Sequence, residues 1–211
     1  MSEQFVGIDL ETSAGNHDGR IIQVGISLGT EASMNFCTLV YPNHDRVEVV
    51  ERSTGPTPAG TLLWEKGAEK VHGIPYEQLE GAPAPTTVDR WATDFLNEHG
   101  IGPKDAIAVG WNVGTFDMPF VRRELPELST LFHYRHVDLN SLVFGLAEGS
   151  RRYAKNPAQA RGYEGWKKLS KRYASLILGG DQWHDAGFDA RASLVAFRWL
   201  AEQDVTRTLL T

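Results

Sequence analysis

The sequence predicts an α/β fold in which an antiparallel three-strand meander is followed by alternating helices and strands. Residues 1–41 contain three apolar strand-like runs separated by short turn-like connections. In the second half of the chain, segments with helical apolar spacing alternate with short strand-like runs. The length of 211 residues suits one domain spanning 1–211, and the chain shows neither an internal repeat nor a linker between domains.

The first three strands are expected at residues 5–12, 21–29 and 33–41. Proline, glycine, threonine and charged residues dominate 42–60, which predicts a loop. Residues 61–73 read as a short helix ending at Gly73, and 75–79 as a second short helical segment with Pro75 in its first turn.

A longer helix is predicted at residues 86–100, with Thr86 or Thr87 as its cap. Its apolar stripe comprises Val88, Trp91, Phe95 and Leu96. Two further strands are expected at 106–112 and 135–139. Further helices are expected at 116–125, from 140 to about 148, and from about 186 to 203.

Composition and charge restrict the function classes. Apolar residues make up 41% and charged residues 23% of the chain, which is typical of a globular protein, and no apolar run reaches membrane-spanning length. Neither a signal pattern nor a second cysteine beside Cys37 is present, so we expect a reducing cytoplasmic location and no membrane partner.

The basic residues are concentrated in one segment. Residues 151–172 contain eight basic residues and only Glu164 as an acid, although the whole chain has a net charge of −6. This asymmetry indicates an anionic ligand on one face, with a solvated basic helix face as the alternative.

Two carboxylates lie on one face of the first strand. In an extended chain Asp9 and Glu11 point to the same side, while Val6, Ile8 and Leu10 point to the other. At roughly 5 Å and an effective dielectric near 20, the two charges repel by about 3 kcal/mol. A cation between them would remove this repulsion.

Other acidic residues lie at helix starts. Asp117 stands where a strand meets a helix, and His184 and Asp189 lie where the last helix begins. Five helical positions turn by about 500°, so one continuous helix would leave the last two roughly 140° apart. We therefore expect His184 on the loop before the helix, with Asp185 as the N-cap.

Four carboxylates and one histidine suit metal-dependent phosphodiester hydrolysis. Mg²⁺ and Mn²⁺ prefer oxygen ligands, and two such ions about 4 Å apart can activate water and stabilise a leaving oxygen. A neutral histidine can accept the proton of the attacking water. A structural Ca²⁺ site would instead favour a contiguous acidic loop.

Three motifs resemble those of the DnaQ-like exonucleases of the DEDDh group: "DLET" at 9–12, "NVGTFD" at 112–117 and "HDAGFDA" at 184–190. The resemblance implies an RNase H-like fold with a five-stranded mixed sheet, and two-metal 3′→5′ exonucleolysis that releases nucleoside 5′-monophosphates. It places the metal ligands at Asp9, Glu11, Asp117 and Asp189, and the general base at His184.

Finer likenesses suggest the residues that contact substrate. The segment "VHGI" at 71–74 is similar to one in proofreading subunits and RNase T-like enzymes, and 124–142 is similar to oligoribonuclease. The resulting candidates are Leu10, Thr12, His72, Ile74, Asn112, Phe116 and Arg135. A capping role for His72, a core role for Phe116 and a surface ion pair for Arg135 remain the alternatives.

The resulting functional prediction is a Mg²⁺- or Mn²⁺-dependent 3′→5′ exonuclease acting on single-stranded nucleic acid with a free 3′ end, with DNA favoured. One alternative is an exoribonuclease acting on short RNA or RNA 3′ ends. Another is an inactive exonuclease-fold module that binds nucleic acid or a polymerase. The resemblance also allows a homodimer.

Overall fold

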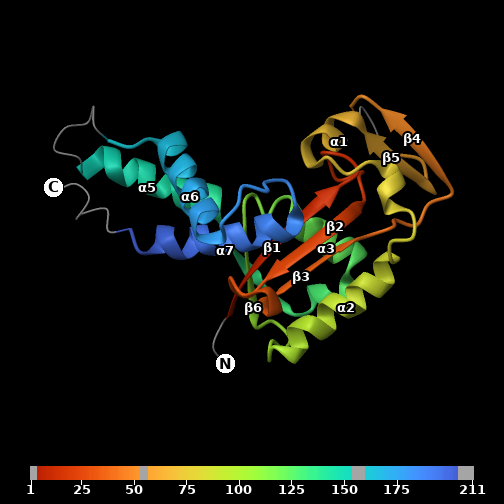
Figure 1. Cartoon of the computed structure of the whole chain (residues 1–211), viewed down its shortest axis with the longest axis horizontal. Helices are drawn as coiled ribbons and strands as arrows, with labels where there is room; N and C mark the ends of the chain where they lie inside the picture. The colour runs from red at the N-terminus through yellow and green to blue at the C-terminus, as the bar shows by residue number, and fades with distance from the viewer. Residues whose placement is uncertain (1–3, 53–56, 154–159, 204–211) are drawn as a thin grey trace.

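A five-stranded mixed sheet forms the centre of the computed structural model, which describes residues 4–52, 57–153 and 160–203 (Figure 1). The strand order is β3-β2-β1-β6-β7. The strands are β1 (Gln4–Thr12), β2 (Ile21–Ser27), β3 (Asn35–Leu39), β6 (Ala106–Gly110) and β7 (Phe132–Asp138). β1, β2 and β3 pair antiparallel, whereas β6 pairs parallel with both β1 and β7. The predicted fold class and the antiparallel order of the first three strands are confirmed.

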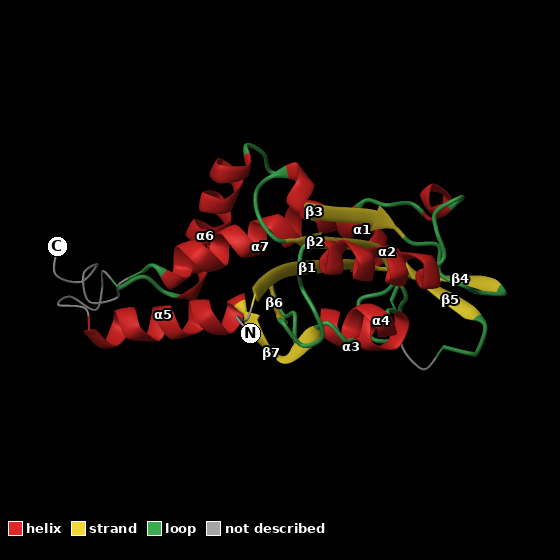
Figure 2. Ribbon diagram, turned by 90° about the horizontal axis from the view of Figure 1, so that it is seen from below, coloured by secondary structure: helices red, strands yellow, loops and turns green. Residues whose placement is uncertain are grey.

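Helices cover both faces of the sheet (Figure 2). One group comprises α2 (Pro85–Glu98), α3 (Asp117–Glu124) and α4 (Pro126–Ser129), and the other α5 (Leu139–Tyr153), α6 (Tyr163–Leu178) and α7 (Ala186–Ala201). Val6 and Ile8 share one buried cluster with Phe120 of α3, whereas Val109 shares another with Trp166 of α6 and Leu194 of α7. The alternation predicted for β1 is therefore realised, with its apolar side toward α2 and α3.

The segment between β3 and α2 differs from the prediction. Within 42–60, expected as a loop, β4 (Arg46–Val50) pairs parallel with β5 (Thr61–Glu65). The predicted helix at 61–73 therefore begins only at Lys66, as α1 (Lys66–His72), and ends at Gly73 as expected. The apolar run of β5 is strand because Leu62 and Trp64 are buried in a separate small core beneath the ladder. The segment at 75–79 forms a 3₁₀ turn, Tyr76–Leu79.

The cap predicted for α2 is wrong, whereas its apolar stripe is confirmed at Val88, Phe95 and Leu96 and is wrong only at Trp91. The helix begins at Pro85 and has no side-chain cap, because the residue at the cap position, Ala84, has no side-chain acceptor. Trp91 is 46% exposed, and the buried face instead includes Asp89. The Asp89 carboxylate accepts hydrogen bonds from the backbone N–H groups of Glu127 (3.0 Å) and Leu128 (2.8 Å), which attaches α2 to the start of α4.

Smaller differences affect the second half of the chain. The strand expected at 106–112 ends at Gly110, the one at 135–139 begins at Phe132, and the helix expected to end near 148 continues to Tyr153. Part of the basic segment forms α6, for which no separate element was predicted, while residues 154–159 of that segment lie outside the described residues. Within the described ranges, no helix combines the length and apolarity needed to cross a membrane.

Candidate active site

Two glycines let α7 lie directly against the sheet (Figure 1). A Cβ atom on Gly7 of β1 would lie 2.1 Å from the carbonyl oxygen of Ala190, and one on Gly25 of β2 would lie 1.9 Å from that of Ala186. Both distances are far shorter than a van der Waals contact, so any side chain at these positions would push the helix away. Gly25 pairs with Asp9 across the β1–β2 ladder, and the contact therefore occurs beside the predicted site.

The start of α7 is also attached to β2 by Gln23. Its side-chain carbonyl accepts a hydrogen bond from the N–H of Ala186, and its amide group donates to Asp185 Oδ2, both at 3.0 Å. Asp185 Oδ1 accepts from the N–H of Phe188 at 2.9 Å, which confirms Asp185 as the predicted N-cap. Gln23 is therefore part of the capping structure that places the first turn of α7.

Asp117 is brought to β1 by an unpaired strand edge. β6 pairs with β1 only as far as Gly7, so the N–H of Leu10 is left without a strand partner on that side. Asp117, the first residue of α3, accepts this N–H through Oδ1 at 3.0 Å. The bond fixes the Asp117 carboxylate at the strand that carries Asp9 and Glu11, although more than 100 residues separate them in sequence.

His184 lies on the loop before α7, as predicted, with a positive φ of 73°. Its backbone N–H donates to Asp189 Oδ2 at 3.0 Å, while Asp189 Oδ1 is buried without a hydrogen-bond partner among the described residues. Ligand-capable atoms of Glu11, His184 and Asp189 lie within 4.8 Å of one another. The exposed His184 side chain thus lies beside two of the buried carboxylates.

Burial raises the pKa of every carboxyl group in this cluster, and repulsion from other members adds to this effect for Asp9 and Glu11. Burial raises the pKa of Glu11 to about 8, with further contributions from Asp189 and Asp117. Burial also raises the pKa of Asp117 to about 8, against the opposing effect of the hydrogen bond from Leu10. The pKa values of Asp9 and Asp189 are raised as well, in each case mainly by burial. The metal-free cluster therefore disfavours its own full ionisation.

A hollow of about 200 Å³ opens over these carboxylates. It is lined by Asp9, Leu10, Glu11, Trp111, Asn112, Phe116, Asp117, Asn140, Lys167, Lys171, His184 and Asp189. All five residues predicted as catalytic meet here, from the first strand, the start of α3 and the start of α7. The opposite wall, formed by α6, carries two lysines.

The residues predicted to contact substrate divide into two groups. Leu10, Asn112 and Phe116 line the hollow. Outside its lining, Thr12 is buried and donates through Oγ1 to the carbonyl of Ala14, and Ile74 is buried in the small core under β5.

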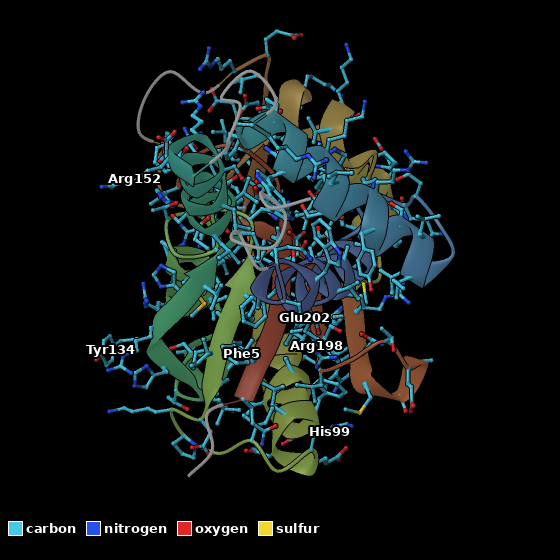
Figure 3. All side chains as sticks on the ribbon, turned by 90° about the vertical axis from the view of Figure 1, so that its left-hand side faces the viewer. Phe5, His99, Tyr134, Arg152, Arg198 and Glu202 are labelled. Atoms are coloured by element: carbon cyan, nitrogen blue, oxygen red, sulfur yellow. The ribbon has the colours of Figure 1, made fainter. Side chains whose placement is uncertain are left out.

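His72 and Arg135 also lie outside the lining. His72 Nδ1 accepts the N–H of Ile74 at 3.0 Å, and its Nε2 is buried without a partner among the described residues. Burial lowers the pKa of His72 to about 4, against an opposing effect of Glu69 and with a smaller lowering effect of His184, which favours the neutral ring. Arg135 is exposed on β7, beside Tyr134 at the outer edge of the sheet (Figure 3).

Two residues of the site were not singled out from the sequence. Gln23 holds α7, and Asn140 at the start of α5 donates to Asn112 Oδ1 at 2.7 Å and accepts from the hydroxyl of Tyr163 on α6. Both are polar residues within otherwise apolar segments. The strand alternation could have indicated Gln23, because the antiparallel register places it directly opposite Glu11.

Comparison with known proteins gives sequence relatives that are named oligoribonuclease. No protein-family model matches the chain. The oligoribonuclease of Mycobacterium bovis is 27% identical over 143 residues, covering 67% of this chain and 63% of the relative. That of Mycobacterium ulcerans is 26% identical over the same length and coverage. The match thus spans less than two thirds of the length of these curated relatives.

Two solved exonuclease structures have the same fold. E. coli exonuclease I in complex with a dT13 oligonucleotide aligns over 98% of this chain and 42% of its own, with a TM-score of 0.60 and 16% identity. A 3′-exonuclease bound to the histone mRNA stem-loop aligns over 96% of this chain and 84% of its own, with a TM-score of 0.55 and 15% identity. These neighbours confirm the RNase H-like fold. Together with the sequence relatives they confirm the resemblance to DnaQ-like exonucleases.

Proposed function

We propose that this chain is a metal-dependent 3′→5′ exonuclease that hydrolyses single-stranded nucleic acid and releases nucleoside 5′-monophosphates. The observation that carries the proposal is the convergence of four carboxylates, from three distant segments, on one hollow beside His184. We assign this activity to one domain spanning residues 1–211. The relatives named oligoribonuclease and the exonuclease neighbours support the same reaction class.

The carboxylate cluster fits divalent metal ions. Asp189 Oδ1 is buried without a partner among the described residues, a costly state for a carboxylate that a cation would relieve. We propose Mg²⁺ or Mn²⁺, two per site, held by Asp9, Glu11, Asp117 and Asp189, because these hard cations prefer oxygen ligands. When bound, such ions activate water and stabilise the leaving oxygen of a phosphodiester.

His184 is proposed as the general base. Its side chain is exposed at the rim of the hollow, while its backbone is fixed to Asp189 by the hydrogen bond from its N–H. A ring attached in this way can reach the attacking water and return its proton to solvent. The four carboxylates leave no need for His184 as a ligand, although its ring nitrogen lies near enough to Glu11 and Asp189 to be one.

The proposed substrate is a single strand with a free 3′ end, with DNA favoured. The candidate contacts are Leu10, Thr12, His72, Ile74, Asn112, Phe116 and Arg135. The second candidate function, an exoribonuclease acting on short RNA, is favoured by the relatives named oligoribonuclease. An inactive module is the weakest candidate, since all five catalytic positions are filled and meet at one point.

Two further parts of the proposal concern context. The single cysteine, Cys37, suits a reducing cytoplasmic location. A homodimer that does not involve a membrane follows from the resemblance alone, and its test is the molar mass in solution.

The experiment is digestion of matched 5′-labelled DNA and RNA strands, from dinucleotide to long single strand, with Mg²⁺, Mn²⁺ or EDTA. We expect shortening from the 3′ end and 5′-mononucleotide products with metal only, and loss of both in Asp9→Asn. The preferred strand chemistry and length decide between the two candidate substrates. Full activity in EDTA, or products with 3′-phosphates, would refute the two-metal mechanism.

A further inference from the structure

The basic segment contributes two lysines of α6 to the wall of the active-site hollow. Lys167 and Lys171 line the hollow, whereas Lys168 and Arg172 of the same helix are exposed on its outer side. The inward residues are four positions apart, so they lie one above the other on one helix face, about 6 Å apart along the axis. Only this face of the helix meets the site.

Both ammonium groups are held over aromatic rings. Lys171 Nζ lies 4.2 Å from the ring centroid of Trp183 and 5.8 Å from that of Trp111. Lys167 Nζ lies 5.6 Å from the ring centroids of both Trp111 and Tyr163. Contacts of this kind orient a cation while leaving its N–H groups available for an anion.

Neither lysine forms an ion pair with a carboxylate of the described residues. Lys171 is half-buried, and burial lowers its pKa, with Asp189 and Asp9 acting in the opposite direction. Its side chain lines the same hollow as Asp9 and Asp189 without pairing with either carboxylate. Lys167 lies one helical turn closer to Tyr163, the first residue of α6, and so farther from the start of α7.

Hydrogen bonds hold this wall in position relative to the second motif. The Tyr163 hydroxyl donates to Asn140 Oδ1, and Asn140 Nδ2 donates to Asn112 Oδ1 at 2.7 Å. The start of α6 is thus attached to the loop that leads to Asp117. The spacing between the carboxylates and the lysines is set by the fold, as expected of a preformed site.

We propose that Lys171 binds the phosphate at the bond to be cleaved and Lys167 binds the phosphate one nucleotide upstream. The assignment rests on the proposed exonuclease function and extends it. One helical turn approximates the separation of successive phosphates in an extended strand. Lys171 contacts Trp183, the residue before His184, whereas Lys167 contacts Tyr163, so the direction from Lys171 to Lys167 leads away from His184. The face of α6 that carries the two lysines therefore contacts the nucleotides on the 5′ side of the terminal one.

Substrate length tests the two positions separately. A dinucleoside monophosphate contains only the cleaved phosphate, whereas a trinucleoside diphosphate also contains the upstream one. We expect Lys167→Gln to raise KM for the trinucleotide about tenfold and leave the dinucleotide unchanged, because one charge-assisted contact is lost. We expect Lys171→Gln to lower kcat/KM about tenfold or more on both substrates.

The matched control is the outward pair, Lys168→Gln with Arg172→Gln. It removes two positive charges from the same helix, one more than either inward variant, so a general electrostatic or folding effect would be at least as large there. We expect this control to remain within about twofold of the wild type, as is usual for exposed charges. Lys167→Arg and Lys171→Arg keep the cation and should recover part of the loss caused by glutamine.

Each outcome decides the assignment. Three results would overturn the assignment without affecting the proposed exonuclease function. They are an equal loss of kcat/KM on both substrates in Lys167→Gln, an equal loss in the outward pair, and unchanged kinetics in both inward variants. A wild-type protein that releases no mononucleotide with Mg²⁺ or Mn²⁺ would instead overturn the proposed function, and the assignment with it.

Discussion

Single residues at this site have a role in folding, and the proposed function adds a chemical one. Asp117 accepts the N–H of Leu10, which β6 leaves unpaired, and also contributes charge to the buried cluster. Asp189 likewise accepts the N–H of His184 with one oxygen and leaves the other without a partner among the described residues. Substitutions that keep hydrogen-bonding capacity but remove charge can separate the two purposes.

Asp117→Asn is the first such test. The amide oxygen can still accept the N–H of Leu10, so we expect the fold to persist, with higher stability of the metal-free protein because a buried repulsive charge is gone. Loss of a metal ligand forfeits several kcal/mol of transition-state stabilisation, so kcat should fall at least about a hundredfold. Thermal unfolding and Mn²⁺-supported digestion measure the two effects. Asp94→Asn, at an exposed position on α2, is the control, and an active Asp117→Asn would remove this residue from the metal site.

His184→Ala tests the proton acceptor. Removal of a general base lowers turnover by about two to four orders of magnitude, while the four carboxylates should still bind metal. Single-turnover rates at several pH values and Mn²⁺ titration by calorimetry distinguish these effects, and added imidazole should restore part of the rate. His99→Ala, at the end of α2 (Figure 3), serves as control. A parallel loss of metal affinity would make His184 a ligand instead.

At the scale of elements, the site depends on how closely α7 approaches the sheet. Gly7 and Gly25 permit the contact, and Gln23 fixes the register of the helix start by bonding to Asp185 and Ala186. Together they place Asp189 at the strand that carries Asp9 and Glu11. The catalytic geometry is therefore a property of helix docking as much as of the acidic residues.

Gly25→Ala should disrupt this docking. Its Cβ would lie 1.9 Å from the carbonyl oxygen of Ala186, so the helix must move away from β2. Overpacking typically costs about 1–3 kcal/mol of unfolding free energy, and activity should fall further because Asp189 is displaced. Urea unfolding and digestion assays measure both. Gly29→Ala, whose Cβ would meet nothing closer than Met34 Cβ at 3.7 Å, should be nearly neutral, and equal behaviour of the two variants would contradict the docking argument.

The elements predicted correctly are those whose pattern is local. The alternation in β1 and the glycine at the end of α1 have local physical causes, and the structure contains both. β5 was predicted as helix because an apolar run such as that around Leu62 fits either state, and its pairing with β4 is a tertiary choice. Trp91 was predicted on the buried face of α2 from its apolar spacing, but it is exposed, and the buried face instead includes Asp89. Asp89 is buried because it accepts hydrogen bonds from N–H groups of α4, and sequence spacing alone does not reveal these bonds.

The same distinction holds for the site. The five catalytic candidates were found from strand alternation and helix starts, their roles were assigned from the resemblance to a known family, and the structure brings them together. Gln23 and Asn140 act through hydrogen bonds to residues far away in sequence, which no local pattern encodes. The sequence alone does not show that Lys167 and Lys171 line the hollow while Lys168 and Arg172 face outward. That difference depends on which face of α6 meets the hollow.

For the whole molecule, the buried carboxylate cluster of the site opposes folding unless protons or cations bind to it. Glu11 has an ordinary pKa of 4.5 and a pKa of about 8 in the folded, metal-free protein. Between these values the folded state binds more protons than the unfolded state, so the stability contributed by this group is complete below pH 4.5 and is lost as pH rises through about 8. Metal ions require the deprotonated carboxylates, so they should replace the protons.

This linkage predicts opposite pH trends for the metal-free and the metal-bound protein. In EDTA, the unfolding midpoint of Glu11→Gln should rise relative to the wild type as pH increases from about 5 to 8, because in this range the unfolded wild type gains stability by ionising Glu11 while the folded protein keeps this carboxyl protonated. The midpoint gain from Mn²⁺ should be larger for the wild type near pH 8 than near pH 6, and smaller in the variant throughout. Scanning calorimetry at fixed ionic strength measures both, with Glu98→Gln on α2 as control. A midpoint difference between wild type and Glu11→Gln that does not change with pH would show that Glu11 is already ionised in the metal-free fold, and would remove the electrostatic reason for a cation beside it.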